Sequence, residues 1–152
     1  MISVEPARLS DAEAIAALVN AWADREQMLH RSVGEVYETI RDFHVARDEE
    51  GGLVACGGLH VMDADLAEIR ALAVNQEIQG TGAGALVVEA CIADAERIGI
   101  ARVFALTYQP GFFERQGFRI ANVMEFPQKV WNECVRCPLF TNCKEIAVVR
   151  EL

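Results

Sequence analysis

The sequence predicts a single α+β domain spanning residues 1–152, with a mixed, mostly antiparallel central sheet flanked by helices. Two helix-start signals lie early in the chain, and three apolar segments separated by tight turns follow them. The last part of the chain alternates between strand and helix patterns. Early helices followed by a meander of adjacent strands are typical of α+β proteins. The length of 152 residues suits one domain with a substantial core.

The first segments predict a strand and two helices. A short strand is expected over residues 2–4. Helices are expected over residues 10–22 and 32–41, because each begins with a capping box, a serine followed three residues later by a glutamate. A polar loop joins the two helices.

The middle of the chain predicts an antiparallel meander. Apolar strand patterns occupy residues 43–47, 53–62 and 66–74. Glycines and aspartates form the intervening turns at 48–52 and 63–65, because glycine tolerates positive φ and aspartate favours turns.

The strand over residues 66–74 carries two charges in an apolar setting. Side chains alternate between the two faces of a strand. Strict alternation places Glu68, Arg70 and Leu72 on one face. The opposite face then carries only apolar residues: Ala67, Ile69, Ala71 and Ala73.

The remaining chain predicts two further helices and three strands. A helix over residues 85–98 ends at Gly99, which suits a left-handed C-cap. The other expected segments are a strand at 101–106, a helix at 110–116, a strand at 118–126, an irregular cysteine-bearing tail at 127–144 and a strand at 145–150.

Charge and composition exclude several classes of function. The net charge of −9 repels polyanions, so no nucleic-acid partner is expected. No apolar run is long enough to span a bilayer, and the first residues lack an apolar signal core. A cytoplasmic protein with no membrane partner is therefore expected.

Three glycines separate the 66–74 strand from the following helix. Gly80, Gly82 and Gly84 let a ligand approach the backbone closely, and the first amides of a helix attract anions. Neither the dinucleotide-binding nor the P-loop glycine spacing fits. A simple strand-to-helix turn is the alternative interpretation.

Two sequence motifs, however, resemble those of the GNAT acetyltransferase superfamily. The segment from Val74 to Gly84, with its Gln79-x-x-Gly82-x-Gly84 pattern, is similar to the acetyl-CoA motif of that superfamily, with Gln76 in place of the common proline. The segment from Phe112 to Phe118, FFERQGF, looks like its second signature.

The resemblance implies the GNAT fold and acetyl-CoA as cosubstrate. It also implies three sets of cofactor-binding residues. The diphosphate cradle comprises Gln79, Gly80, Thr81, Gly82, Ala83, Gly84 and Ala85; the strand beside pantetheine comprises Leu72, Ala73 and Val74; and the second signature contributes Phe112 and Phe113.

From about residue 6 to residue 152, the loops and the cysteine-bearing tail look like those of short, stand-alone N-acetylglutamate synthases. This resemblance implies acetyl transfer to the α-amino group of L-glutamate, the first step of arginine biosynthesis. Many superfamily members are dimers, so a homodimer formed through the apolar Leu139–Phe140 region and the final strand is an open possibility.

The reaction requires groups that move protons. Glu68 is the expected general base, because partial burial of a carboxylate raises its pKa towards neutrality. A plain ion pair with Arg70 is the alternative. The resemblance implies an oxyanion donor among the amides near Ala73 or Val74. It also implies a tyrosine as general acid at the position where this chain has Phe113, so Tyr108 is the expected substitute. Two alternatives remain: Tyr108 is a half-buried structural side chain, or the thiolate leaves without a general acid.

The expected substrate has two carboxylates and therefore needs cations. Arginine binds carboxylates in bidentate geometry. The candidates are Arg31 with Ser32, Arg70 and Lys129, and each cation has the alternative of an ordinary surface charge.

The tail cysteines are weak candidates for a metal site. Cys134, Cys137 and Cys143 have metal-ligand spacing but lack an evident fourth ligand, so no resident metal is expected. Free thiols or an oxidative disulfide are the alternatives. Cys56 and Cys91 are interpreted as small core residues.

Two other functions stay open. One is acetylation of another amine or amino acid, although Arg31 disfavours cationic substrates. The other is a catalytically silent acetyl-CoA-binding regulatory module, which the absence of a tyrosine at Phe113 allows.

Overall fold

The computed structural model describes residues 1–127 and 145–152 of the chain. The predicted substrate residue Lys129, the metal candidates Cys134, Cys137 and Cys143, and the Leu139–Phe140 region lie outside the described residues.

Within the described residues, seven strands form one sheet in the order β1-β2-β3-β4-β5-β7-β6. The strands are β1 (Ser3–Pro6), β2 (Phe43–Arg47), β3 (Leu53–Asp63), β4 (Leu66–Val74), β5 (Arg102–Thr107), β6 (Arg119–Ala121) and β7 (Ile146–Glu151). Every neighbouring pair is antiparallel except β4 and β5, which are parallel. The predicted mixed, mostly antiparallel sheet is confirmed.

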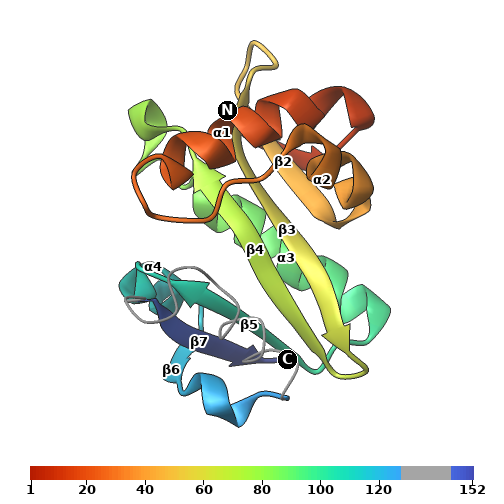
Figure 1. The fold of residues 1–152 in the computed structure, drawn as a ribbon, viewed down its shortest axis with the longest axis vertical. Helices are drawn as coiled ribbons and strands as arrows, with labels where there is room; N and C mark the ends of the chain where they lie inside the picture. Colours follow the sequence, from red (N-terminus) through yellow and green to blue (C-terminus); the bar gives the residue numbers. More distant parts are fainter. Residues whose placement is uncertain (128–144) are drawn as a thin grey trace.

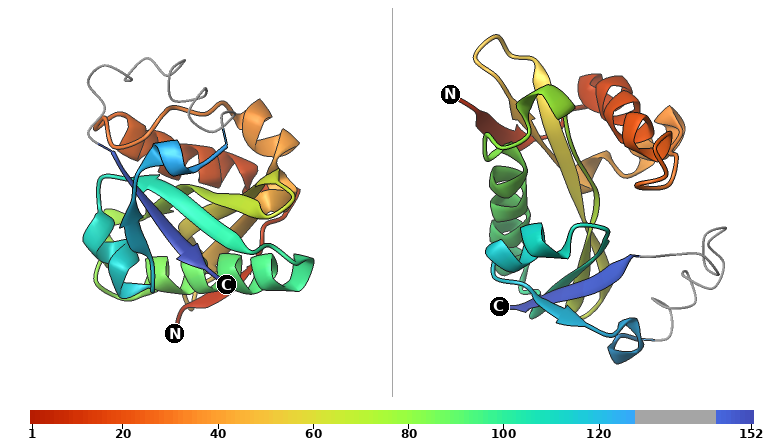
Figure 2. Two further views of the ribbon diagram at one scale, coloured as in Figure 1. Left: turned by 90° about the horizontal axis from the view of Figure 1, so that it is seen from below. Right: turned by 90° about the vertical axis from the view of Figure 1, so that its left-hand side faces the viewer.

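In the part of the chain that the structure describes, four α-helices flank this sheet: α1 (Ala12–Ala23), α2 (Val33–Glu38), α3 (Ala83–Ile98) and α4 (Pro110–Arg115). Short 3-10 turns occupy Leu9–Asp11, Ile40–Asp42, Gln76–Ile78 and Val123–Glu125. Helix α3 lies along one face of β3 and β4, while α1 and α2 cover the other (Figures 1 and 2).

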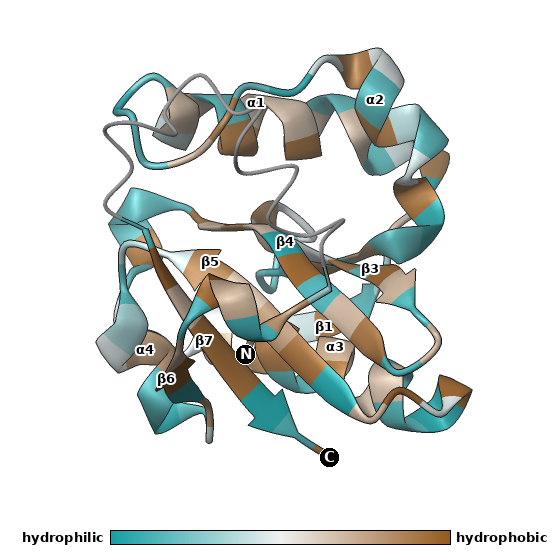
Figure 3. Ribbon diagram, turned by 60° about the horizontal axis from the view of Figure 1, so that its bottom comes forward, coloured by the Kyte–Doolittle hydropathy of each residue, from teal (hydrophilic) through white to brown (hydrophobic). Residues whose placement is uncertain are grey.

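Apolar side chains explain the layers. The α3 residues Val87, Val88, Cys91 and Ile92 are buried against the strands, and α1 buries Ile15 and Val19 on the opposite face. A third cluster around Leu66 and Phe104 fills the end of the sheet near β5 and β7. Figure 3 shows that the middle residues of the strands are mainly hydrophobic and that several loops are hydrophilic.

The expected capping box at residues 10–13 is wrong. The chain instead makes a 3-10 turn over Leu9–Asp11, in which the Asp11 carboxylate accepts the Arg8 backbone N–H at 2.8 Å. The Arg47 guanidinium also donates to this buried carboxylate, at 2.8 and 2.9 Å. This long-range ion pair fixes Asp11, and α1 begins one residue later.

At the second expected capping box only the serine cap is confirmed, and its helix is shorter than expected. The Ser32 hydroxyl accepts the Glu35 backbone N–H at 3.1 Å. Helix α2 ends at Glu38 rather than at Arg41, and a 3-10 turn over Ile40–Asp42 leads into β2.

The expected strand over residues 118–126 is wrong beyond Ala121. The Asn122 side chain accepts the Met124 N–H at 2.9 Å, and the Glu125 carboxylate accepts the Asn122 N–H at 2.8 Å. These two side-chain hydrogen bonds cap a 3-10 turn and end the strand.

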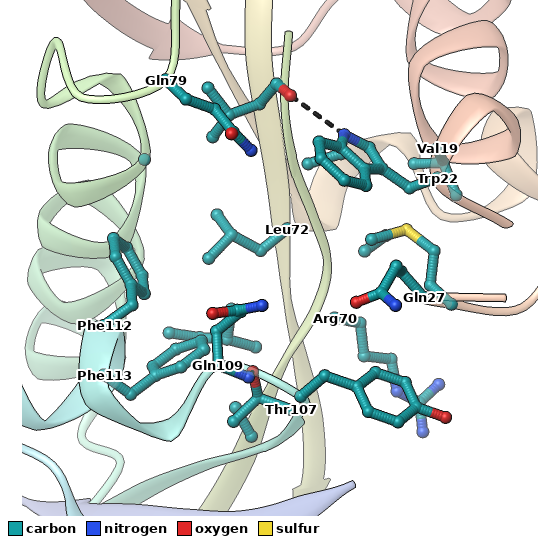
Figure 4. Close-up of a pocket in the computed structure, with 18 of the residues that line it drawn as sticks. Val19, Trp22, Gln27, Arg70, Leu72, Gln79, Thr107, Gln109, Phe112 and Phe113 are labelled. Atoms are coloured by element: carbon teal, nitrogen blue, oxygen red, sulfur yellow. Dashed lines mark hydrogen bonds between the residues drawn. The ribbon is translucent and has the colours of Figure 1, made fainter. Parts of the chain in front are cut away.

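The expected alternation along β4 is wrong from Ala71 onward: Ala71 and Ala73 pack in the α1 core rather than with Ala67 and Ile69, and Leu72 is also on the opposite face from the one expected. Ala71 has a φ of 53°, and the β3–β4 register shifts between the pairs Gly58–Arg70 and Cys56–Ala73. One extra β4 residue therefore forms a bulge, which reverses the alternation beyond it. Leu72 packs in the α3 core, and Arg70 lies on the other side of β4 (Figure 4). Glu68 stays with Arg70, because the two side chains form an ion pair.

Candidate active site

The parallel strands β4 and β5 separate and leave a cleft. They pair only at their beginnings, where Leu66, Ala67 and Glu68 face Arg102, Val103 and Phe104. Beyond Glu68 the two strands diverge (Figure 1). The cleft that opens between them has a volume of about 1180 Å³, enough for a cofactor arm and a small substrate.

The glycine stretch forms the end of this cleft nearest α3. Gly80 and Gly82 have φ values of 86° and 88°, in the left-handed region that glycine adopts without strain. Gly82 is the N-cap of the 16-residue helix α3, whose first amide groups therefore face an open site. The geometry suits an anion such as a diphosphate.

Most of the predicted cofactor residues line the cleft. These are Leu72, Ala73, Val74, Gln79, Gly80, Gly82, Ala83, Gly84, Ala85, Phe112 and Phe113. Thr81 is not among the lining residues. Its hydroxyl donates to the Ile78 carbonyl at 2.6 Å. The roles assigned to these residues stay predictions.

Gly84 serves close packing rather than backbone freedom. A Cβ there would lie 3.1 Å from Val74 Cγ2 and 3.4 Å from Phe112 Cζ. The missing side chain thus lets α3 begin against both β4 and the second signature. Phe113 is only 4% exposed and packs edge-to-face with Phe112 and Phe118.

Three charged side chains share the opposite wall of the cleft. Glu68 and Arg70 form an ion pair, and their side chains are 12% and 22% exposed. Burial lowers the pKa of Arg31, and the neighbouring Arg70 guanidinium lowers it further, against opposing effects of Glu68 and Glu35. All three residues line the cleft.

Asn20 fixes the backbone of Arg31. Its side-chain amide donates to the Arg31 carbonyl at 2.9 Å and accepts the Arg31 N–H at 2.8 Å. The two hydrogen bonds hold the α1–α2 loop against α1. Ser32, by contrast, lies outside the residues that line the cleft and caps α2.

The end of β4 presents a donor and an acceptor to the cleft. Asn75 N–H donates to the Val54 carbonyl at 2.8 Å. Because successive residues of an antiparallel strand point their backbone groups to opposite sides, Ala73 faces β3 and Val74 faces the cleft. The Val74 carbonyl accepts the Trp22 indole N–H at 2.9 Å (Figure 4). Of the two candidate oxyanion donors, Val74 has the suitable orientation.

Tyr108 also lines the cleft, in the turn that follows β5. The Thr107 hydroxyl accepts the Gln109 N–H at 2.8 Å and fixes the backbone on either side of Tyr108. Its role as general acid stays a prediction.

Residues 1–127 and 145–152 contain no group of three or more His, Cys, Asp or Glu side chains that could hold a metal ion. Among the same residues, no helix has the length and apolar character needed to cross a membrane. Cys56 and Cys91 are buried free thiols, as expected for core residues.

A family model described as acetyltransferase (GNAT) family matches residues 13–118, which include both signatures and the cleft between β4 and β5. The chain belongs to the acetyltransferase (GNAT) family. Its sequence similarity to particular relatives then indicates which kind of acetyltransferase it resembles.

Two of the relatives match this chain over most of their own length as well. An uncharacterized N-acetyltransferase of Chlorobaculum tepidum is 42% identical over 149 residues, covering 98% of this chain and 96% of the relative. An amino-acid acetyltransferase of Mycobacterium tuberculosis is 36% identical over 135 residues, covering 88% of this chain and 77% of the relative.

Solved structures agree with this relationship. An N-acetylglutamate synthase from Neisseria gonorrhoeae, complexed with coenzyme A and N-acetyl-glutamate, has a TM-score of 0.90 and 29% identity. The match covers all of this GNAT chain but only 35% of the gonococcal chain. A Mycobacterium tuberculosis protein in complex with CoA has a TM-score of 0.85 and 30% identity, with 99% of each chain covered.

These findings confirm the predicted GNAT fold, the acyltransferase class and acetyl-CoA as cosubstrate. The chain is an acetyl-CoA-dependent N-acetyltransferase related to amino-acid acetyltransferases. Sequence reasoning missed Asn20 and Trp22, which reach the site from α1. An asparagine and a bulky tryptophan in one helix were the only local signals.

Proposed function

We propose that this GNAT enzyme transfers the acetyl group of acetyl-CoA to the α-amino group of L-glutamate, the first step of arginine biosynthesis. The observation that carries the proposal is the environment of Arg31. Within the described part of the chain, Arg31 makes no ion pair, although it is partly buried beside the like charge of Arg70. A partly buried cation in such a setting favours an anionic ligand.

The charge of the cleft points the same way. Counted over residues 1–127 and 145–152, its lining contains four arginines and two glutamates, whereas the whole chain has a net charge of −9. These residues are Arg25, Arg31, Arg70 and Arg115, with Glu68 and Glu145. A locally cationic cleft attracts both the phosphates of CoA and a dicarboxylic amino acid.

The relatives support the same substrate. The Mycobacterium tuberculosis and Neisseria meningitidis relatives are named amino-acid acetyltransferases, and the gonococcal structure holds N-acetyl-glutamate with coenzyme A. Arg31 and Arg70 supply the cations that two carboxylates would need.

Glu68 then acts as the base, directly or through one water. It takes a proton from the substrate ammonium, and the freed amine attacks the thioester carbonyl carbon. The Val74 amide stabilises the oxyanion, since it faces the cleft. The attacking nitrogen loses its second proton to solvent, the C–S bond breaks and the acetyl group stays on nitrogen. The CoA thiolate takes a proton from solvent, or from Tyr108, which then regains a proton from solvent.

Replacement of Arg31 tests this substrate assignment. Arg31→Ala should raise the KM for glutamate about 10- to 100-fold, because a hydrogen bond to a charged group contributes about 1.5–3 kcal/mol. The Kd of CoA should change less than about twofold. Arg97→Ala is the matched control, because Arg97 pairs with Asp94 on α3 and is not among the cleft-lining residues. An unchanged glutamate KM in Arg31→Ala would remove Arg31 from the substrate site.

A second candidate, a catalytically silent acetyl-CoA-binding regulatory module, is favoured by Phe113. Where the resemblance implies a tyrosine acid, this chain has a core phenylalanine that packs between Phe112 and Phe118. Tight CoA binding with no thiol release for any amino acid would favour this function instead.

A further inference from the structure

Trp22 links helix α1 to the end of β4. Its indole N–H donates to the Val74 carbonyl at 2.9 Å, across 52 residues of sequence. Figure 4 shows the ring between the α1 side of the cleft and β4, with the hydrogen bond drawn. Trp22 also lines the cleft.

The Val74 carbonyl is an edge group. It points away from β3, because the neighbouring Asn75 N–H pairs with Val54. Strand β5 pairs with β4 only as far as Glu68 and therefore leaves the end of β4 unpaired on that side. An extended ligand lying in the cleft could pair with such an edge as an added strand does.

Trp22 is held in a fixed position. Its backbone carbonyl accepts the N–H groups of Arg25 and Gln27 at 3.0 and 3.1 Å, which close the turn at the end of α1. The Arg25 guanidinium lies 5.6 Å from the indole ring centroid, and the ring packs against the core below α1. The indole N–H is therefore a stationary donor rather than a mobile one.

We propose that Trp22 is a positioning residue that sets the register of the acyl-CoA pantetheine arm on β4. This inference rests on the proposed path of the arm along Leu72–Val74. The Trp22 N–H takes one of the two acceptor lone pairs of the Val74 carbonyl, so an arm amide N–H that paired there would share the oxygen with the indole and gain less. The Val74 N–H stays available for the thioester oxygen of the arm. This difference favours one register of the arm on β4.

Loss of the indole N–H would make a second register more favourable. An arm amide could then donate to the Val74 carbonyl, and the arm would move by one pairing step. One step is two residues, or about 7 Å along a strand. That distance removes the thioester from the reach of Glu68 and the amine, which need contact at about 3 Å.

The test uses two variants of the whole protein. Trp22→Phe removes the donor together with part of the ring. Site-specific incorporation at position 22 of a tryptophan analogue with sulfur in place of the indole N–H removes the donor and keeps the shape. In both, kcat should fall about a hundredfold, because small misplacements cost about that much, while the Kd of CoA stays within about threefold. The analogue keeps the packing, so its kinetics stay interpretable even if Trp22→Phe unfolds.

Hydrogen exchange of the indole N–H measures the Trp22–Val74 hydrogen bond directly. The chain has only two tryptophans, so the indole N–H signal of Trp22 can be identified by comparison with Trp22→Phe. It should stay protected from hydrogen exchange when CoA is added. Rapid exchange in the CoA complex would mean that the ligand displaces Trp22, and an unchanged kcat in the analogue would mean a purely structural role. Either result overturns the proposal. Failure of the unmodified protein to bind CoA would instead contradict the proposed path of the arm.

Discussion

The two ends of helix α3 provide a matched pair of glycines for testing the diphosphate cradle. Gly82 at the start and Gly99 at the end have φ values of 88° and 90°, and a Cβ at either would meet no atom within 4 Å. Alanine at either position is strained by about 1–2 kcal/mol without a clash. For a chain of this size, each kcal/mol lowers Tm by about 2–4 °C. Gly82→Ala and Gly99→Ala should therefore lose similar stability.

Only Gly82 lines the cleft, so the two variants should differ in CoA binding. A methyl group at Gly82 keeps the diphosphate from one of the helix amides. A hydrogen bond to a charged group contributes about 1.5–3 kcal/mol, which corresponds to a Kd about 10- to 100-fold weaker. Gly82→Asp should weaken binding further, because it adds a negative charge beside the phosphates.

Calorimetric titration with CoA measures Kd, and a thermal melt of the same samples measures the strain. The expected pattern is equal Tm losses with a Kd change in Gly82→Ala alone. If Gly82→Ala bound CoA as tightly as Gly99→Ala, the glycine loop would not be the diphosphate site. Equal weakening in both would show that strain in α3, rather than contact, controls affinity.

Two further predictions concern the α1 side and the core. Asn20→Ala removes both hydrogen bonds to the Arg31 backbone. The glutamate KM should therefore rise about tenfold in steady-state assays, while the Kd of CoA stays unchanged. A parallel loss of glutamate and CoA binding would mean general unfolding. Burial raises the pKa of the Cys56 and Cys91 thiols to about 12. Above about pH 9 the folded protein therefore keeps thiol protons that the unfolded chain releases. The free energy of unfolding has its full value below about pH 9. Between about pH 9 and 12 it declines by about 1.4 kcal/mol per pH unit for each thiol. Denaturant titrations of the wild type should show this steeper decline relative to Cys56→Ala/Cys91→Ala, and equal slopes would contradict the argument.

The sequence predicted features that depend on local backbone chemistry. The left-handed Gly99 marks the end of α3, and the Ser32 cap marks the start of α2, because these choices are made within a few residues. The residues that line the end of the cleft nearest α3 were predictable for the same reason, since their motif is continuous in sequence. Helix α3 begins at Ala83, two residues before the expected start at residue 85.

The structural predictions that proved wrong concern features that depend on long-range contacts. Nothing in the apolar run around Ala71 signals a bulge, because the residue is not a glycine and the extra residue is visible only against β3. Likewise, the Arg47 ion pair that displaces the predicted start of α1 spans 36 residues. Asn20 and Trp22 act through partners 11 and 52 residues away, so their contacts could not be found from spacing.

The most direct test of the proposed function measures CoA thiol release with saturating acetyl-CoA across the twenty amino acids. L-glutamine is the decisive control, because it matches glutamate in size but lacks the second carboxylate. The account predicts selective turnover with L-glutamate and N-acetyl-L-glutamate as the product identified by mass. Equal turnover with glutamine, or turnover only with a neutral or cationic amine, would contradict a site built around Arg31 and Arg70.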